Sequence, residues 1–137
     1  MYKTLISGSR EVEESDYNVS CVAFSLFTIA RQKGGIDKLE VISGGARGID
    51  TIAKRAANRI GAKFTEVPAD WKKHGRVAGP IRNRVMLDLE PDIVWAFPVG
   101  KSVGTRDCIR QAERRGIPVI TANTKEYFEE PDERRED

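Results

Sequence analysis

Five short apolar runs divide this chain, and longer stretches with helical spacing separate them. The runs are mostly apolar rather than strictly alternating, which is typical of strands buried on both faces of a sheet. They cover residues 2–7, 39–43, 62–67, 92–97 and 117–122. The pattern therefore predicts an α/β protein in which strands and helices alternate.

Apolar residues at helical spacing predict one helix in each of the four intervals. These helices are expected over residues 16–33, 49–60, 80–89 and 105–115. The apolar face of the first helix consists of Val19, Val22, Ala23, Leu26 and Ala30. In the third helix, Pro80 suits the first turn, and Ile81, Val85 and Leu89 are expected to face the core.

Strands that alternate with helices of this length are joined by right-handed crossovers into a mostly parallel sheet. We expect a Rossmann-like, doubly wound fold with helices on both faces and five strands in the order 3-2-1-4-5. This order places the ends of strands 1 and 4 side by side, where ligands bind in such sheets. A single domain is expected over residues 1–124, followed by an acidic tail, partly helical or disordered, over residues 125–137.

Charge and cysteine content narrow the class of protein. The formal net charge is +2, but the last nine residues hold six acids and two arginines, so residues 1–128 carry about +6. A moderately basic folded part suits an anionic ligand. Cys21 and Cys108 have no metal or redox spacing, His74 is the only histidine, and no apolar run reaches the ~20 residues of a membrane span. We expect a cytoplasmic protein with reduced thiols and with no metal, cofactor or membrane contact.

Three glycine-rich stretches each follow a predicted strand and precede a predicted helix. They read SGSR at 7–10, SGGARGID at 43–50 and FPVGKSVGTRD at 97–107. Glycine accepts a sharp turn and lets backbone N–H groups approach a ligand, and helix N-termini favour phosphate. The residues expected to bind such a ligand are Gly8, Ser9, Arg10, Gly44, Gly45, Arg47, Asp50, Gly100, Lys101, Ser102, Gly104 and Thr105. Two other roles are open for Asp50. It orients Arg47, or its negative charge stabilises the N-terminus of the helix in which it lies.

These glycines also have a purely structural explanation, because any strand-to-helix turn can use one. None of the three stretches matches a P-loop or the spaced G-x-G-x-x-G of dinucleotide enzymes. The segment 68–86 adds Asp70, Arg82 and Asn83 as candidate ligand contacts. Arg82 lies in a first helical turn, where its charge opposes the helix dipole, so binding an anion explains it better than helix stability does. Trp71 is a candidate for stacking on a base or for packing.

Four stretches of the chain, in order, resemble one superfamily. They are SGSR…D at 7–16, SGGARGID at 43–50, PADW…GRVAGPIRNRVM at 68–86 and AFPVGKSVGTRDCIRQAERRGIPV at 96–119. Together they are similar to the SLOG superfamily, most closely its YspA-related members. The resemblance implies a Rossmann-like domain that binds nucleotides or nucleotide derivatives. It also implies a homo-oligomer. The helix faces with Phe24, Phe27 and Met86 are candidate surfaces for it, although such residues more often pack in a core.

More distant relatives suggest different activities. SGGARGID resembles a motif of the DNA-processing protein A family, which binds single-stranded DNA. RNRVM at 82–86 resembles a motif of the Lonely Guy phosphoribohydrolases, in which the arginine contributes to catalysis. Those enzymes carry a glutamate three residues after the threonine that matches Thr105, whereas this chain has Cys108 there. Asp107 is the nearest carboxylate, but a shift of one residue in a helix turns the side chain by about 100°.

Three hypotheses follow for the function. The first is a module that binds a nucleotide or nucleotide derivative as a sensor, carrier or sequestering protein. The second is a phosphoribohydrolase that cleaves the N-glycosidic bond of a nucleoside monophosphate, with Arg82 and Asp107 as the catalytic pair. The third is a short single-stranded nucleic-acid binder, which the aromatic content of 7% and the modest charge disfavour.

Overall fold

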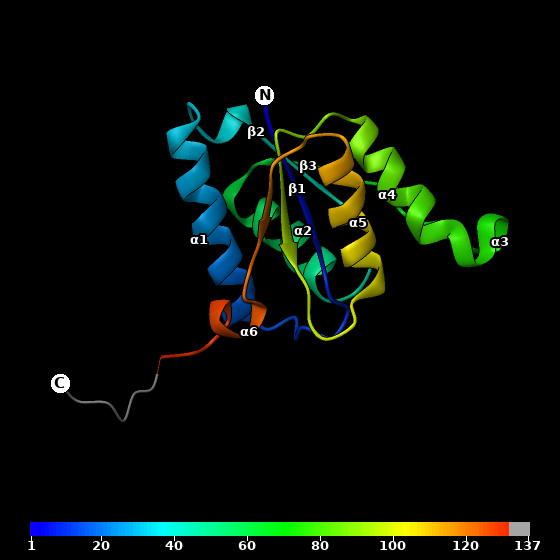
Figure 1. The fold of residues 1–137 in the computed structure, drawn as a ribbon. Helices are drawn as coiled ribbons and strands as arrows, with labels where there is room; N and C mark the ends of the chain where they lie inside the picture. The colour runs from blue at the N-terminus through cyan, green and yellow to red at the C-terminus, as the bar shows by residue number, and fades with distance from the viewer. Residues whose placement is uncertain (132–137) are drawn as a thin grey trace.

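The computed structural model describes residues 1–131 and shows the predicted α/β fold (Figure 1). The strands are β1 (Tyr2–Gly8), β2 (Leu39–Ser43), β3 (Lys63–Glu66), β4 (Ile93–Phe97) and β5 (Val119–Thr121). The helices are α1 (Asp16–Gln32), α2 (Ile49–Ile60), α3 (Trp71–His74), α4 (Ala78–Asp88), α5 (Val103–Arg114) and α6 (Thr124–Tyr127). Single 3₁₀ turns, Ile36–Lys38 and Gly75–Val77, precede β2 and α4.

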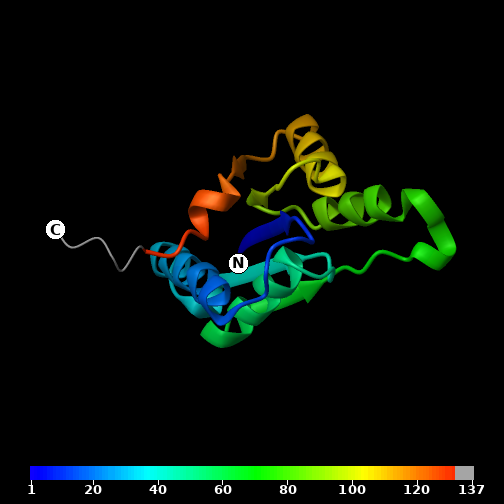
Figure 2. The same ribbon diagram turned by 90° about the horizontal axis from the view of Figure 1, so that it is seen from below.

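The five strands form one parallel sheet in the order β3-β2-β1-β4-β5, which confirms the predicted topology. Helices α1 and α2 lie on one face of the sheet, and α4 and α5 lie on the other (Figure 2). Alternate side chains of each strand enter the two layers, so Ile6 packs against the α1–α2 side and Leu5 against the α4–α5 side. Within residues 1–131, no helix has both the length and the apolar character needed to cross a membrane.

The apolar face predicted for α1 is confirmed, whereas the face predicted for the third helix is confirmed at Leu89, which packs against the core, and is wrong at Val85. Val85 points to solvent, and the buried side chains of α4 include Asn83, Met86 and Leu87. Three consecutive apolar residues at 85–87 fit two different stripes, and the prediction placed Val85 in the buried one. Met86 is therefore also not a surface residue, contrary to its predicted place on an oligomer interface.

Residues after β5 return to the α1 face of the sheet. Tyr127 and Phe128 pack against the apolar core, and the Tyr127 hydroxyl lies 2.7 Å from Ser25 Oγ on α1. Burial raises the pKa of Tyr127 to about 12. Residues 132–137, which hold much of the expected acidic tail, lie outside the described residues. The division of the chain at residue 124 stays a prediction.

Candidate functional site

Two hollows lie at the carboxyl ends of the strands. The larger, with a volume of about 560 Å³, lies between the loops that follow β1 and β4 and the start of α4; we call it the central cavity. The smaller, of about 480 Å³, lies beside the loop after β2 and is called here the side hollow. Arg10, Ala46, Trp71 and Arg82 line both, so the two hollows adjoin.

The structure sorts the predicted ligand-binding residues into three groups. The central cavity is lined by Gly8, Ser9, Arg10, Asp50, Arg82, Lys101, Ser102, Gly104, Thr105 and Asp107. The side hollow is lined by Arg10, Gly44, Gly45, Arg47 and Arg82. Asp70, Asn83 and Gly100 line neither. Residues of all three glycine-rich stretches therefore line the central cavity, but Gly44, Gly45 and Arg47 of the second stretch line only the side hollow.

The first loop is fixed by packing and backbone bonds. The Ser9 N–H donates to the Phe97 carbonyl at 3.0 Å, and the Ser9 carbonyl accepts from Ile49 N–H at 3.1 Å. A Cβ on Gly8 would lie 2.6 Å from the Ile49 side chain. Glycine at position 8 is thus required for the start of α2 to pack against the end of β1.

The glycines of the second loop make room for other parts of the protein. A Cβ on Gly44 would fall on the Arg82 guanidinium, and one on Gly45 would lie 2.9 Å from the Glu66 carboxyl carbon. Gly48, with φ near +74°, lies against the backbone of Ser9 and Arg10. None of these three glycines leaves an open space in which a ligand could replace the missing side chain.

Carboxylates of the chain already occupy backbone donors at the start of α2. Ala46 N–H donates to Asp50 Oδ2 at 3.1 Å, and Gly48 N–H donates to Glu14 Oε2 at 2.9 Å. Arg47 forms an exposed ion pair with Glu11 at 3.2 Å, so Asp50 does not orient Arg47. Asp50 instead lies in the first turn of α2, where a negative charge suits the helix dipole.

Arg82 and Asp50 form a buried pair at the junction of the two hollows. Arg82 Nη1 donates to the Gly44 carbonyl at 2.8 Å and lies 4.0 Å from Asp50 Oδ2. Burial raises the pKa of Asp50 above its ordinary value, while the Ala46 N–H and the Arg82 charge act in the opposite direction. Arg82 therefore supports the second loop in addition to presenting a positive charge to both hollows.

The first turn of α5 lies in the central cavity and has no side-chain cap. The start of α4 lines the cavity and lacks a side-chain cap as well, but Pro80 in its first turn has no N–H to donate. Ser102 precedes α5 without a side-chain cap, and the first turn of this helix contains no acidic residue. A Cβ on Gly104 would meet no atom within 4 Å, and Gly104 lines the cavity. Arg106 donates to the carbonyls of Lys101 and Gly100, so its guanidinium holds the loop. Open space and helix N–H groups thus coincide here, as an anion requires.

A hydrogen-bond chain connects α4 with α5 at the cavity. Arg82 Nε donates to Asn83 Oδ1 at 3.1 Å, and Asn83 Nδ2 donates to Asp107 Oδ2 at 3.0 Å. Gln111 Nε2 donates to the same Asp107 oxygen at 2.8 Å. Asn83 was expected to contact the ligand, but it is buried and acts on residues that do line the cavity.

Position 108, where the related hydrolases carry a glutamate, and position 107, where this chain has an aspartate, face different ways on α5. Cys108 is fully buried in the core under α5, and burial raises its pKa to about 11. Asp107 lines the central cavity together with Arg82. The rotation between adjacent helical residues, which was expected to weaken the hydrolase hypothesis, in fact turns Asp107 toward the cavity and Cys108 away from it.

In the segment before α4, the structure places one predicted ligand contact outside both hollows and adds a residue that the sequence did not assign to the site. Asp70 is exposed and caps the short helix α3 through Lys73 N–H at 3.0 Å. Trp71 lines both hollows, and the Arg10 guanidinium lies 5.6 Å from its ring centroid. Arg76 also lines the central cavity, as does Glu11. The sequence showed a basic, tryptophan-containing segment here but not the turn that points Arg76 inward.

Residues 1–131 contain no group of three or more His, Cys, Asp or Glu side chains that could hold a metal ion. The candidate site therefore consists of helix N–H groups, four basic side chains, a half-exposed tryptophan and three carboxylates. The basic side chains that line the central cavity are Arg10, Arg76, Arg82 and Lys101.

Comparisons with known proteins agree with the motifs. A model of the YspA, cpYpsA-related SLOG family matches residues 3–74, slightly more than half of the chain. The Gene 61 protein of Mycobacterium phage D29 is 41% identical over 130 residues, which cover 91% of this chain and 99% of that protein. The structure of DNA processing protein A (DprA) from Streptococcus pneumoniae is similar, with a TM-score of 0.47 and 19% identity, over 89% of this chain and 59% of that one. The chain belongs to the YspA, cpYpsA-related SLOG family.

Proposed function

We propose that the central cavity binds a nucleotide or nucleotide derivative, with its phosphate against the first turn of α5. The observation that carries this proposal is that this helix start has no acidic residue and no side-chain cap, and that Gly104 leaves open space beside it. A phosphate oxygen placed there accepts N–H bonds and gains from the helix dipole. Lys101 and Thr105 line the same part of the cavity and add a charge and a hydroxyl.

The rest of the nucleotide extends toward Trp71. A base needs a flat partner, and Trp71 is half-exposed where the central cavity meets the side hollow. The Arg10 guanidinium beside the Trp71 ring and the Arg82 guanidinium further in supply positive charge along this route. A volume of about 560 Å³ lies within the usual range for small-molecule sites, about 300–1,000 Å³. Binding without reaction corresponds to a sensor, carrier or sequestering role.

A ligand series tests this proposal. Purified protein is mixed separately with AMP, ADP-ribose, NAD, a cyclic dinucleotide and a short oligodeoxynucleotide, and the proton NMR signals of each ligand are followed over hours. We expect broadened signals for at least one of the first four and no new signals. If none of the four broadens while the oligodeoxynucleotide does, with an affinity that falls steeply with salt, the site is a nucleic-acid site instead.

A second candidate function is hydrolysis of an N-glycosidic bond, because Asp107 lines the cavity beside Arg82. In that reaction water adds to C1′ of the ribose, the C1′–N bond breaks, and the base leaves with a proton. A carboxylate can stabilise the positive charge that develops on the ribose, and Asp107 is held for this by Asn83 and Gln111. Arg82 is then the second member of the pair.

The hydrolase hypothesis predicts free-base signals in the same NMR experiment. Asp107→Asn keeps the size of the side chain and should abolish base release while phosphate binding at α5 persists. Release of base from no nucleotide would exclude this hypothesis and leave the binding function intact. A cytoplasmic location and the nature of the biological signal stay predictions.

A further inference from the structure

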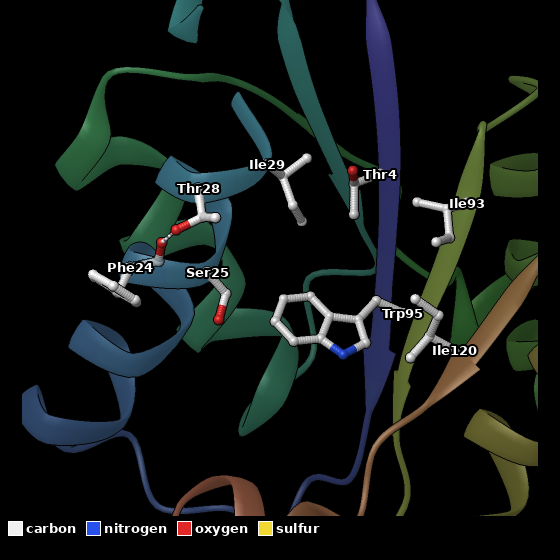
Figure 3. A pocket seen from close by; sticks show the side chains of 8 residues that line it. All are labelled: Thr4, Phe24, Ser25, Thr28, Ile29, Ile93, Trp95 and Ile120. Carbon is white, nitrogen blue, oxygen red and sulfur yellow. Dashed lines mark hydrogen bonds between the residues drawn. The ribbon is translucent and has the colours of Figure 1, made fainter. Parts of the chain in front are cut away.

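A third hollow lies on the α1 face of the sheet and shares no lining residue with the two hollows at the strand ends. It has a volume of about 380 Å³ and runs between α1 and the strands β1, β4 and β5 (Figure 3). Its lining consists of Thr4, Phe24, Ser25, Thr28, Ile29, Ile93, Trp95 and Ile120. We call this hollow the sheet groove.

Side chains from three neighbouring strands form the floor of the sheet groove. Thr4 on β1 pairs with Ile93 on β4, and Trp95, two residues further along β4, pairs with Ile120 on β5. Helix α6 leaves this floor uncovered, because it has only four residues and its Tyr127 packs beside Trp95. The groove therefore follows from the register of the sheet and from the shortness of α6.

The eight residues that line the sheet groove include no charged residue, and three of them carry a hydroxyl. Ser25 Oγ lies 2.7 Å from the Tyr127 hydroxyl, and the Thr28 hydroxyl donates to the Phe24 carbonyl at 3.0 Å. The Thr4 hydroxyl, by contrast, has no hydrogen-bond partner. Among residues 1–131 it is the one buried side-chain nitrogen or oxygen without such a partner.

This unpartnered hydroxyl is costly, because Thr4 is fully buried in the middle strand of the sheet. A buried polar group that loses water without gaining a partner destabilises the fold, whereas valine has nearly the same shape and lacks that group. Ile29 and Ile93 lie on either side of Thr4 in the groove and offer it no hydrogen bond (Figure 3). A buried water needs about two to four polar partners, which these side chains do not supply. The Thr4 hydroxyl is therefore suited to a polar group carried by an otherwise apolar molecule.

We propose that the sheet groove binds a small neutral molecule that has an aromatic ring and one hydroxyl or carbonyl group, and that this polar group bonds to Thr4 Oγ1. Trp95 lines the groove and provides an aromatic partner for the ring. Because no charged residue lines the groove, a neutral ligand fits it better than an ion does. A volume of about 380 Å³ lies at the lower end of the range for small-molecule sites. This site is separate from the proposed nucleotide site and does not depend on it.

Other occupants fit the groove less well. The six residues beyond those described, 132–137, are all charged and do not suit an apolar hollow. An apolar side chain of a partner protein would fill the groove but would leave the Thr4 hydroxyl without a hydrogen bond. A ligand with one polar group satisfies both the apolar walls and the hydroxyl.

Two probes that differ by one hydroxyl, 4-ethylphenol and ethylbenzene, test the proposal. The chain is labelled at its isoleucine δ1 methyl groups and titrated with each probe up to about 1 mM, the affinity range of such small ligands. We expect the NMR signals of Ile29, Ile93 and Ile120 to shift, and that of Ile42, which packs on the other face of the sheet, to stay. 4-Ethylphenol should bind about fivefold more tightly than ethylbenzene, the effect of one added hydrogen bond.

Thr4→Val removes the unpartnered hydroxyl and keeps the shape of the side chain. Ethylbenzene should bind this variant as it binds the wild type, which also shows that the variant folds and keeps the groove. 4-Ethylphenol should bind the variant about tenfold more weakly than the wild type, because its hydroxyl then leaves water without gaining a partner.

Thr28→Val is the matched control, because Thr28 lines the same groove but its hydroxyl already bonds to the Phe24 carbonyl. This variant should keep the preference for 4-ethylphenol. The proposal would be overturned if neither probe shifted the signals of the three isoleucines in the groove. A preference for 4-ethylphenol that persists in Thr4→Val would also overturn it, as would a preference lost to the same extent in Thr28→Val.

Discussion

The loops that follow β2 and β4 are both rich in glycine, yet they use it for opposite purposes. In the loop after β2, the missing side chains of Gly44 and Gly45 leave room for Arg82 and Glu66. In the loop after β4, the missing side chain of Gly104 leaves room for nothing in the chain itself. The loop after β2 is therefore filled by the protein's own side chains and is called here the closed loop. The loop after β4 has space for a ligand and is called the open loop.

The N-termini of α2 and α5 differ in the same way as the loops that precede them. At α2, Asp50 and Glu14 accept N–H bonds from the residues around the first turn. At α5, no acidic residue lies in the first turn, and Asp107 is turned to bonds with Asn83 and Gln111. We therefore expect a glycine-rich turn before a helix to bind phosphate only where the chain has not supplied its own carboxylate.

The largest effect is expected from Gly44→Ala in the closed loop. Its Cβ would displace the Arg82 guanidinium and leave Asp50 without its neighbouring charge in a buried place. We expect the free energy of unfolding to fall by about 3 kcal/mol or more, as when one partner of a buried pair is lost. Chemical denaturation measures this change.

A double-mutant cycle identifies the cause. In an Arg82→Ala background the guanidinium that the new Cβ meets most closely is absent, and Asp50 Oδ2 at 2.9 Å is the remaining close contact, so Gly44→Ala should cost less there. Equal costs in both backgrounds would mean that Gly44 is needed for some reason other than Arg82.

The second-largest effect is expected from Gly104→Ala in the open loop, which should raise stability and lower nucleotide affinity. Alanine suits a helix better than glycine, so the free energy of unfolding should rise by about 0.5 kcal/mol. The new methyl group projects into the central cavity and should weaken nucleotide binding by about tenfold, which is about 1.4 kcal/mol. Calorimetric titration and denaturation of the same variant measure both. Unchanged affinity would show that the phosphate lies elsewhere.

A smaller effect on nucleotide affinity is expected when a basic side chain is removed, and it should differ between the open loop and the closed loop. Lys101→Ala removes a cation from the central cavity and should lower nucleotide affinity by about threefold to fivefold at low salt. Arg47→Ala removes an equally exposed cation that pairs with Glu11 beside the side hollow, and it should change affinity by less than about twofold. A larger loss for Arg47→Ala than for Lys101→Ala would reverse the assignment of the two loops.

The smallest effect concerns the pH dependence of the closed loop. Because burial raises the pKa of Asp50, the folded chain holds that proton more tightly than the unfolded chain does. The contribution of Asp50 to stability is then fully present below its ordinary pKa of 3.8 and is lost as the pH rises through the raised value. Stability of the wild type relative to Asp50→Asn should therefore fall as the pH rises from 3.8 through the raised pKa of Asp50. A rise over that range would contradict this account.

The sequence predicted the sheet order and the meeting of the loops because both follow from strand and helix alternation. Five apolar runs with helices between them allow few parallel topologies, and the carboxyl ends of β1 and β4 must then adjoin. The face of α1 followed from Val19, Val22 and Leu26 because those residues form a single unambiguous stripe.

Side-chain direction could not be predicted in the same way. Whether Gly44 faces a ligand or Arg82 depends on a residue 38 positions away, and no local pattern encodes that contact. Cys108 and Asp107 differ by one position, so only the packing of α5 decides which of them lines the cavity. Val85 was misplaced because the three apolar residues at 85–87 fit two stripes, and the burial of Asn83 depends on its bonds to Gly104 and Asp107.

The most direct test of the account is the amide NMR spectrum of ¹⁵N-labelled protein titrated with AMP and with ADP-ribose. We expect the largest shifts at the amides of Val103, Gly104 and Thr105, because these form the uncapped first turn of α5. The amides of Ala46 and Gly48, already bonded to Asp50 and Glu14, should move little. Dominant shifts at Ala46 and Gly48, with α5 unaffected, would contradict the assignment of the phosphate to the loop after β4.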